Sequence, residues 1–116
     1  MRITGGNLKG WVIPAKFASH VRPSTDRMRE SLFNSLIHQV GIEGKPVLDL
    51  FSGSGIIAAE FLSRGAEAVV SVDMDSKNID HQKQMKQLKL PDMVQILEIT
   101  YLRYVCNVNF NRLLRI

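Results

Sequence analysis

The alternation of apolar and polar positions divides the second half of the chain into short helices and strands. Residues 47–51 are mostly apolar and end at a glycine turn, 52–55, after which apolar positions return at helical spacing. Residues 68–73 form a second apolar run and 94–99 a third, with a largely polar helix between them. This order predicts an α/β fold with about three parallel strands and flanking helices, which is half of a doubly wound sheet.

The first forty residues predict a small β-hairpin followed by a helix. Two short apolar patches in 1–14 are separated by glycines, which favours a hairpin. Thr25 and its neighbours are good N-caps, and Gly41 is a natural end for the helix that follows. Met28, Leu32 and Leu36 recur every four residues, so we expect this face of the helix to lie in the core.

Length and composition bound the class of protein. A chain of 116 residues with 45% hydrophobic and 22% charged residues is typical of one globular domain. We divide it into an N-terminal hairpin and basic helix, 1–40, and a sheet unit, 41–116.

The sequence contains no apolar run of membrane-spanning length and no signal-peptide pattern, and it has one cysteine. The cytoplasm is therefore the expected location, and no membrane partner is expected. The histidines are scattered, so we interpret them as surface residues and predict no metal site. They are His20, His38 and His81.

Charge is distributed unevenly along the chain. The formal net charge is +4, and residues 1–40 carry all of the excess, with six basic side chains against two acidic ones. Such a segment suits a polyanion such as RNA, although a solvated surface explains the charge on its own about equally well.

Two acidic residues near the glycine turn indicate what kind of ligand it binds. Asp49 interrupts an apolar strand, where a carboxylate is costly unless it accepts hydrogen bonds. Asp73 ends the second strand about twenty residues after the turn, a spacing suited to accepting both hydroxyls of a ribose. The carboxyl ends of parallel strands meet at one edge of the sheet, so we expect the turn and Asp73 to be neighbours around an adenosine-type cofactor.

Two cofactors fit this pattern. Residues 53–58 satisfy G-x-G-x-x-A, which allows a dinucleotide and hence an oxidoreductase. A pyrophosphate would, however, meet Asp49 and Asp73 with no basic residue in the turn. S-adenosylmethionine carries a sulfonium and an ammonium and no phosphate, so it suits an acid-lined site better.

Two stretches carry a family resemblance. Asp49-Leu-Phe-Ser-Gly-Ser-Gly55 resembles the first motif of class I S-adenosylmethionine-dependent methyltransferases. Arg2-Ile-x-Gly-Gly, Gly10 and Arg22-Pro-Ser-Thr-Asp-Arg-Met-Arg-Glu-Ser-Leu-Phe-Asn34 resemble the RsmD family, bacterial enzymes that methylate a guanine N2 in small-subunit ribosomal RNA. The resemblance runs from Met1 to about Val105 and implies a partial Rossmann-like class I methyltransferase sheet preceded by a small hairpin and helix.

The resemblance also implies roles for individual residues. Asp49 and the turn would hold the methionine part of the cofactor, and Asp73 the ribose. Thr100 stands where the family has an acidic or amide residue that reads the adenine amine. The full cofactor-binding set is Asp49, Phe51, Ser52, Gly53, Ser54, Gly55, Asp73, Met74 and Thr100. The RNA-binding set is Arg2, Lys9, Arg22, Thr25, Arg27 and Arg29, with ribosomal RNA or the small ribosomal subunit as the implied partner.

The sequence departs from the family at the chemical step. The Asp/Asn-Pro-Pro-aromatic motif that would present the target amine is absent, so no catalytic residue is assigned. Strands four to seven are also missing, and we expect the first strand to be an exposed edge that another chain or segment covers. The expectation is therefore the front part of a methyltransferase, whether truncated, frameshifted or completed by another chain. The alternative is a catalytically inactive RNA- or cofactor-binding remnant.

Overall fold

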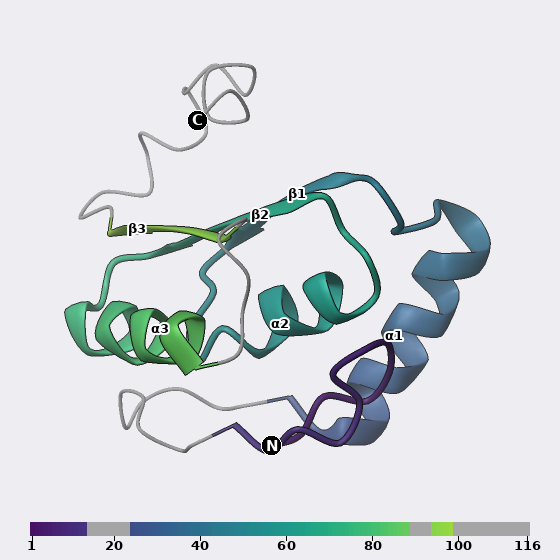
Figure 1. The fold of residues 1–116 in the computed structure, drawn as a ribbon, viewed down its shortest axis with the longest axis horizontal. Coiled ribbons are helices and arrows are strands. Elements are labelled where there is room, and N and C mark those ends of the chain that lie inside the picture. Colours follow the sequence, from purple (N-terminus) through teal and green to yellow (C-terminus); the bar gives the residue numbers. More distant parts are fainter. Residues whose placement is uncertain (14–23, 89–93, 99–116) are drawn as a thin grey trace.

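Three parallel strands form the sheet in the computed structural model, which describes residues 1–13, 24–88 and 94–98 (Figure 1). The strands are β1 (Pro46–Leu50), β2 (Ala68–Asp73) and β3 (Val94–Glu98), in the order β1-β2-β3. The register places Asp49 of β1 beside Ser71 of β2. The predicted parallel strands are confirmed, and within the described residues β1 is an edge strand.

Three helices accompany the sheet: α1 (Asp26–Gln39), α2 (Ile56–Ser63) and α3 (Ser76–Leu88). Helices α2 and α3 lie on the same face of the sheet (Figure 1). There they bury Val69 of β2 together with Ala59 and Met85. Val70 and Val72 belong to a second apolar cluster with Leu48 and Leu50, as expected when successive side chains of a strand point to opposite faces. No helix in the described part of the chain is both long and apolar enough to span a bilayer.

Helix α1 begins and ends where the sequence predicts, but it buries a different face. The Thr25 hydroxyl accepts a hydrogen bond from the Met28 N–H, and after the last turn Gly41 takes a positive φ of 78°. Met28 and Leu32 are 63% and 47% exposed, so their predicted place in the core is wrong. The buried side chains are Arg29 and Phe33, because that face packs on the N-terminal segment and α2. The Phe33 ring meets Phe61 edge to face at 4.7 Å.

The N-terminal residues form the small predicted hairpin, with one antiparallel bridge between Arg2 and Val12. Ile3 and Ile13 are buried in the same apolar cluster as Phe33 and the α2 side chains. At Gly6 a side chain would collide with the Ser63 carbonyl oxygen, since a Cβ would lie 2.0 Å from it. Residues 1–13 and helix α1 therefore share a core with the sheet unit.

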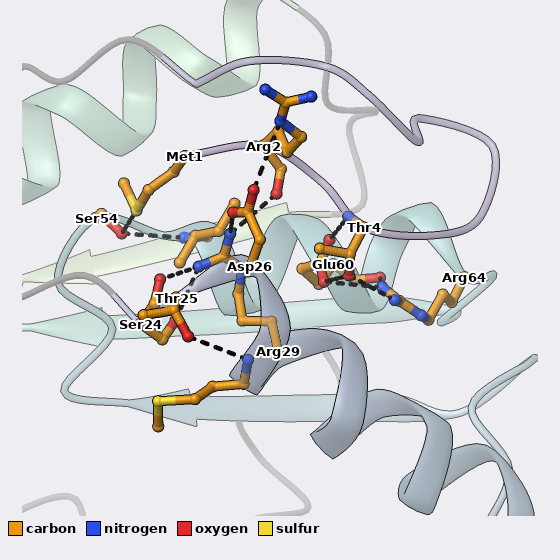
Figure 2. A network of polar contacts seen from close by, with 12 residues as sticks. Met1, Arg2, Thr4, Ser24, Thr25, Asp26, Arg29, Ser54, Glu60 and Arg64 are labelled. Carbon is orange, nitrogen blue, oxygen red and sulfur yellow. Dashed lines mark hydrogen bonds and ion pairs between the residues drawn. The ribbon is translucent and has the colours of Figure 1, made fainter.

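Two buried polar clusters fasten the N-terminal segment (Figure 2). In the Glu60 cluster, Glu60 is fully buried, accepts from the Thr4 N–H and hydroxyl, and pairs with Arg64 at 3.2 Å. Arg64 also donates to the Thr4 hydroxyl at 3.0 Å and lies over the Phe33 ring. In the Arg29 cluster, the guanidinium donates to the Arg2 carbonyl at 3.0 Å, to Ser24 and to Asp26. Both clusters join residues far apart in the chain.

Helix α3 is more buried than its sequence suggests. Lys77, Asp80 and Lys83 are exposed as expected. The opposite face is covered, and His81, interpreted above as a surface residue, is only 2% exposed. The buried side chains of the described part of this helix are Asn78, Ile79, His81, Gln82 and Met85.

Candidate functional site

The turn between β1 and α2 is held by main-chain hydrogen bonds. The Ser52 N–H donates to the Val72 carbonyl at 2.9 Å, and the Gly55 N–H donates back to the Ser52 carbonyl at 3.0 Å. Gly53 and Gly55 have positive φ values of 56° and 81°, which glycine adopts without steric cost. Gly55 is the N-cap of α2 and has no side chain to cap it. The helix therefore begins with main-chain N–H groups directed at the turn.

Asp73 joins the second strand to this turn. Its Oδ2 accepts from the Gly53 N–H at 2.7 Å. Its Oδ1 accepts from the Asp75 N–H at 2.9 Å and from the Asn78 amide at 3.4 Å. The carboxylate is 8% exposed. The prediction that the turn and Asp73 are neighbours at the carboxyl ends of two strands is confirmed.

Asp49 lies next to this arrangement in an unfavourable environment. Burial and the nearby charge of Asp73 raise its pKa from 3.8 to about 6, although the Ala58 N–H lowers it in part. One carboxylate oxygen of Asp49, Oδ2, has no hydrogen-bond partner among the described residues. The same holds for the buried hydroxyl of Ser71, its register partner on β2. A buried acceptor of this kind fits a ligand that brings a cationic donor.

Two predicted cofactor residues are exposed apolar side chains. Phe51 is 71% exposed and has a φ of 57°, the positive region that residues other than glycine rarely adopt. Met74 follows Asp73 and is 62% exposed. They follow the ends of β1 and β2, respectively. Ser52 and Ser54, by contrast, are buried within the turn.

Sequence reasoning missed two polar side chains of α3. Gln82 donates to the Ser52 hydroxyl at 2.9 Å and to the Gly53 carbonyl at 2.8 Å, and Asn78 reaches Asp73. Both are at most 3% exposed. The available signal was their spacing of four residues, which places them one turn apart on the same helix face. A polar stripe of this kind is usually solvated, and the sequence pattern therefore predicts a helix exposed on most of its surface.

The predicted RNA-binding residues occupy different environments. Arg2, Lys9 and Arg27 are exposed, as is the capping residue Thr25. Arg22, like Thr100 of the cofactor set, lies outside the described residues. The N-terminal segment does reach the glycine turn, because the Ser54 hydroxyl contacts the Met1 sulfur at 3.9 Å (Figure 2).

Arg29, predicted to contact RNA, is instead buried. It is 1% exposed, and its guanidinium is occupied by the contacts of the Arg29 cluster. A side chain so enclosed offers no surface to an RNA phosphate. We therefore correct its role from an RNA contact to a structural one.

No group of three or more acidic, histidine or cysteine side chains that could hold a metal ion occurs in the part of the chain that the structure describes. The arrangement consists instead of a glycine turn, the start of a helix and two acids at the ends of adjacent parallel strands. The solved structures that resemble the chain are class I methyltransferases, and the chain shares their α/β fold with a parallel sheet.

The chain belongs to the family described as Conserved hypothetical protein 95, the RsmD family, which it matches over residues 1–109. It is 41% identical over 75 residues to ribosomal RNA small subunit methyltransferase D of Escherichia coli (strain K12), a match covering 65% of this chain and 37% of that protein. The Haemophilus influenzae protein of the same name is 37% identical over 94 residues, with 77% of this chain and 46% of the relative covered.

A solved structure of yhhF from Escherichia coli superposes with a TM-score of 0.77 at 28% identity. The match covers 90% of this chain and 55% of that one. The chain thus matches between 37% and 55% of the length of these proteins, and the predicted family and fold class are confirmed over that part.

Proposed function

We propose that this chain binds S-adenosylmethionine and forms the cofactor-binding part of an RNA methyltransferase that modifies a guanine N2 in small-subunit ribosomal RNA. The observation that carries the proposal is the 2.7 Å hydrogen bond from the Gly53 N–H to Asp73. It joins the glycine turn to the acid of the next strand, and so assembles the two halves of an adenosine-cofactor site. The named relatives, which are ribosomal RNA methyltransferases, support the choice of reaction.

The charge of the site favours S-adenosylmethionine over a dinucleotide. Asp49 already has a raised pKa because it is buried and close to Asp73. A pyrophosphate would add negative charge to this pair, whereas an ammonium donor would give the partnerless Oδ2 of Asp49 a hydrogen bond. In this assignment Asp49 and the turn hold the methionine part of the cofactor, whose sulfonium supplies an electrophilic methyl group.

Asp73 takes the ribose in the same assignment. A carboxylate offers about four lone-pair sites, and three donors of the chain already use Asp73. A ribose with two hydroxyls therefore requires one of these contacts to yield, and the 3.4 Å contact from Asn78 is the longest. Phe51 and Met74 are placed to cover apolar parts of the bound cofactor.

The RNA side of the proposal rests on Arg2, Lys9 and Arg27. These exposed cations belong to the hairpin and to α1, and the hairpin adjoins the turn through the contact between Met1 and Ser54. An RNA strand bound along this surface would lie close to the cofactor. We assign no catalytic residue, because the chain carries no Asp/Asn-Pro-Pro sequence. A cofactor- or RNA-binding unit without activity is thus the second candidate.

Calorimetry of the chain with S-adenosylmethionine and with NAD tests which cofactor it binds. Repeating the titrations at several pH values adds a second criterion, the pH dependence of the affinity. A cationic ligand prefers ionised Asp49, so its affinity should fall as the pH drops below about 6, by up to about tenfold per unit. An anionic pyrophosphate should show the opposite slope. Binding of NAD alone would overturn the proposal.

Asp73→Asn tests the ribose assignment, with Asp80→Asn on the exposed face of α3 as the matched control. We expect affinity for S-adenosylmethionine to fall at least tenfold in Asp73→Asn, since the neutral amide weakens the hydrogen bonds that an ionised acceptor makes. The control should bind as the unmodified chain does. Equal affinities of both variants would refute the role of Asp73.

A further inference from the structure

We infer that Gln82 is a positioning residue that holds the glycine turn in its binding conformation from the neighbouring helix. The inference rests on the proposed cofactor site and adds to it a residue outside the motif itself. Gln82 lies on α3, whereas the turn connects β1 to α2. Its contacts therefore cross between consecutive strand–helix units of the fold.

Both amide hydrogens of Gln82 are used on the turn. Nε2 donates to the Ser52 hydroxyl at 2.9 Å and to the Gly53 carbonyl at 2.8 Å. The Ser52 hydroxyl in turn donates to the Val72 carbonyl at 3.1 Å. The amide therefore connects two successive turn residues to the end of β2. A side chain that uses both its donors in this way fixes the orientation of the peptide group between Gly53 and Ser54.

The stem of Gln82 also limits what the turn can contain. A Cβ added to Gly55 would lie 2.8 Å from the Gln82 Cγ, so the side chain packs directly against the bare backbone at the start of α2. At 3% exposure Gln82 has little freedom to move away. The same residue thus constrains the turn by hydrogen bonding at Ser52 and Gly53 and by contact at Gly55.

One helix face consequently serves both halves of the site. Asn78, one turn before Gln82, donates to Asp73 at 3.4 Å, and Asp73 accepts from the Gly53 N–H. Gly53 is then held on both sides, at its N–H by Asp73 and at its carbonyl, which belongs to the next peptide group, by Gln82. Loss of Gln82 should loosen the turn, including the Gly53 N–H, where the methionine part of the cofactor would bind, while the contacts of Asp73 with Asp75 and Asn78 remain.

Gln82→Met tests this role because methionine has a similar shape and no amide donor. Gln84→Met on the exposed face of the same helix is the matched control. The first measurement is amide hydrogen exchange, which needs no ligand. We expect exchange at Gly53 and Gly55 to be faster in Gln82→Met than in the control under conditions where both are folded. Unchanged exchange at both glycines would overturn the inference.

The second measurement uses two ligands that differ in the methionine part. S-adenosylhomocysteine carries the amino and carboxyl groups, and methylthioadenosine lacks them. Gln82→Met should bind the first ligand roughly tenfold more weakly, which is the effect of about one hydrogen bond, and the second with unchanged affinity. A uniform loss for both, or no loss for either, would contradict a role at the turn. Failure of the unmodified chain to bind either ligand would instead refute the proposed cofactor function.

Discussion

The polar groups that fasten the N-terminal segment and those that line the glycine turn have opposite environments. In the Glu60 cluster the carboxylate of Glu60 receives donors from Thr4 and Arg64. Beside the turn, Asp49 of β1 is partly buried close to another acid, and its buried Oδ2 has no partner in the described chain. The first region stabilises the fold. The acid beside the glycine turn instead lowers the stability of the fold, as expected of a binding site in which a ligand supplies the missing hydrogen-bond donor.

The largest predicted effect is on the stabilising region. Glu60→Ala should lower the free energy of unfolding by about 3–5 kcal/mol, because it leaves the largely buried guanidinium of Arg64 without its carboxylate. Urea denaturation measures the change. Glu67→Ala, at an exposed position, should alter stability by no more than about 0.5 kcal/mol. Similar values for the two variants would show that the Glu60 cluster does not hold the hairpin.

The next largest predicted effect compares two arginines of α1, one buried and one exposed. Arg29→Ala should destabilise the fold by roughly 2–4 kcal/mol, since it removes a buried side chain with several hydrogen-bond acceptors around it. Arg27→Ala should leave stability within about 0.5 kcal/mol but weaken RNA binding and lower its salt slope by about one. Thermal unfolding and RNA titrations at several salt concentrations separate the two. A stable Arg29→Ala protein with reduced RNA affinity would restore the role first predicted for it.

The smallest predicted effect is a gain in the free energy of unfolding, and it comes from Asp49 in the proposed cofactor site. The folded-state pKa of Asp49, about 6, exceeds its usual 3.8, so the folded chain binds more protons between these values and is destabilised as the pH rises through them. Asp49→Asn should therefore stabilise the protein by roughly 1–3 kcal/mol above pH 6. The gain should disappear below about pH 4. Urea titrations at pH 4 and 7 check it, and a destabilised variant at pH 7 would contradict the account.

The parts of the fold that sequence predicted well are those set by local chemistry. Thr25 caps α1, glycines shape the turn at 52–55, and an apolar run forms β2, each for reasons contained within a few residues. The position of Asp73 beside Gly53 was also predictable, because parallel strands end at a common edge. The family signature in 22–34 identified the class of protein before any geometry was known.

The faces that helices bury were harder to predict, since tertiary packing decides them. Met28 and Leu32 form a regular apolar stripe, yet α1 turns Phe33 and Arg29 inward, where the hairpin supplies the Arg2 carbonyl as an acceptor for the guanidinium. A periodic pattern cannot reveal such acceptors. On α3, Gln82 and its neighbours looked solvated for the same reason: the groups that satisfy them belong to other elements.

The contacts of the hairpin have a consequence for the order of folding. Thr4 and Glu60 are 56 positions apart in the sequence, and the contact between Gly5 and Ser63 spans 58. During synthesis the hairpin leaves the ribosome well before α2, which carries its partners, so it must wait until that helix has formed. The hairpin can therefore take up its place only after a helix that lies much later in the chain has been made.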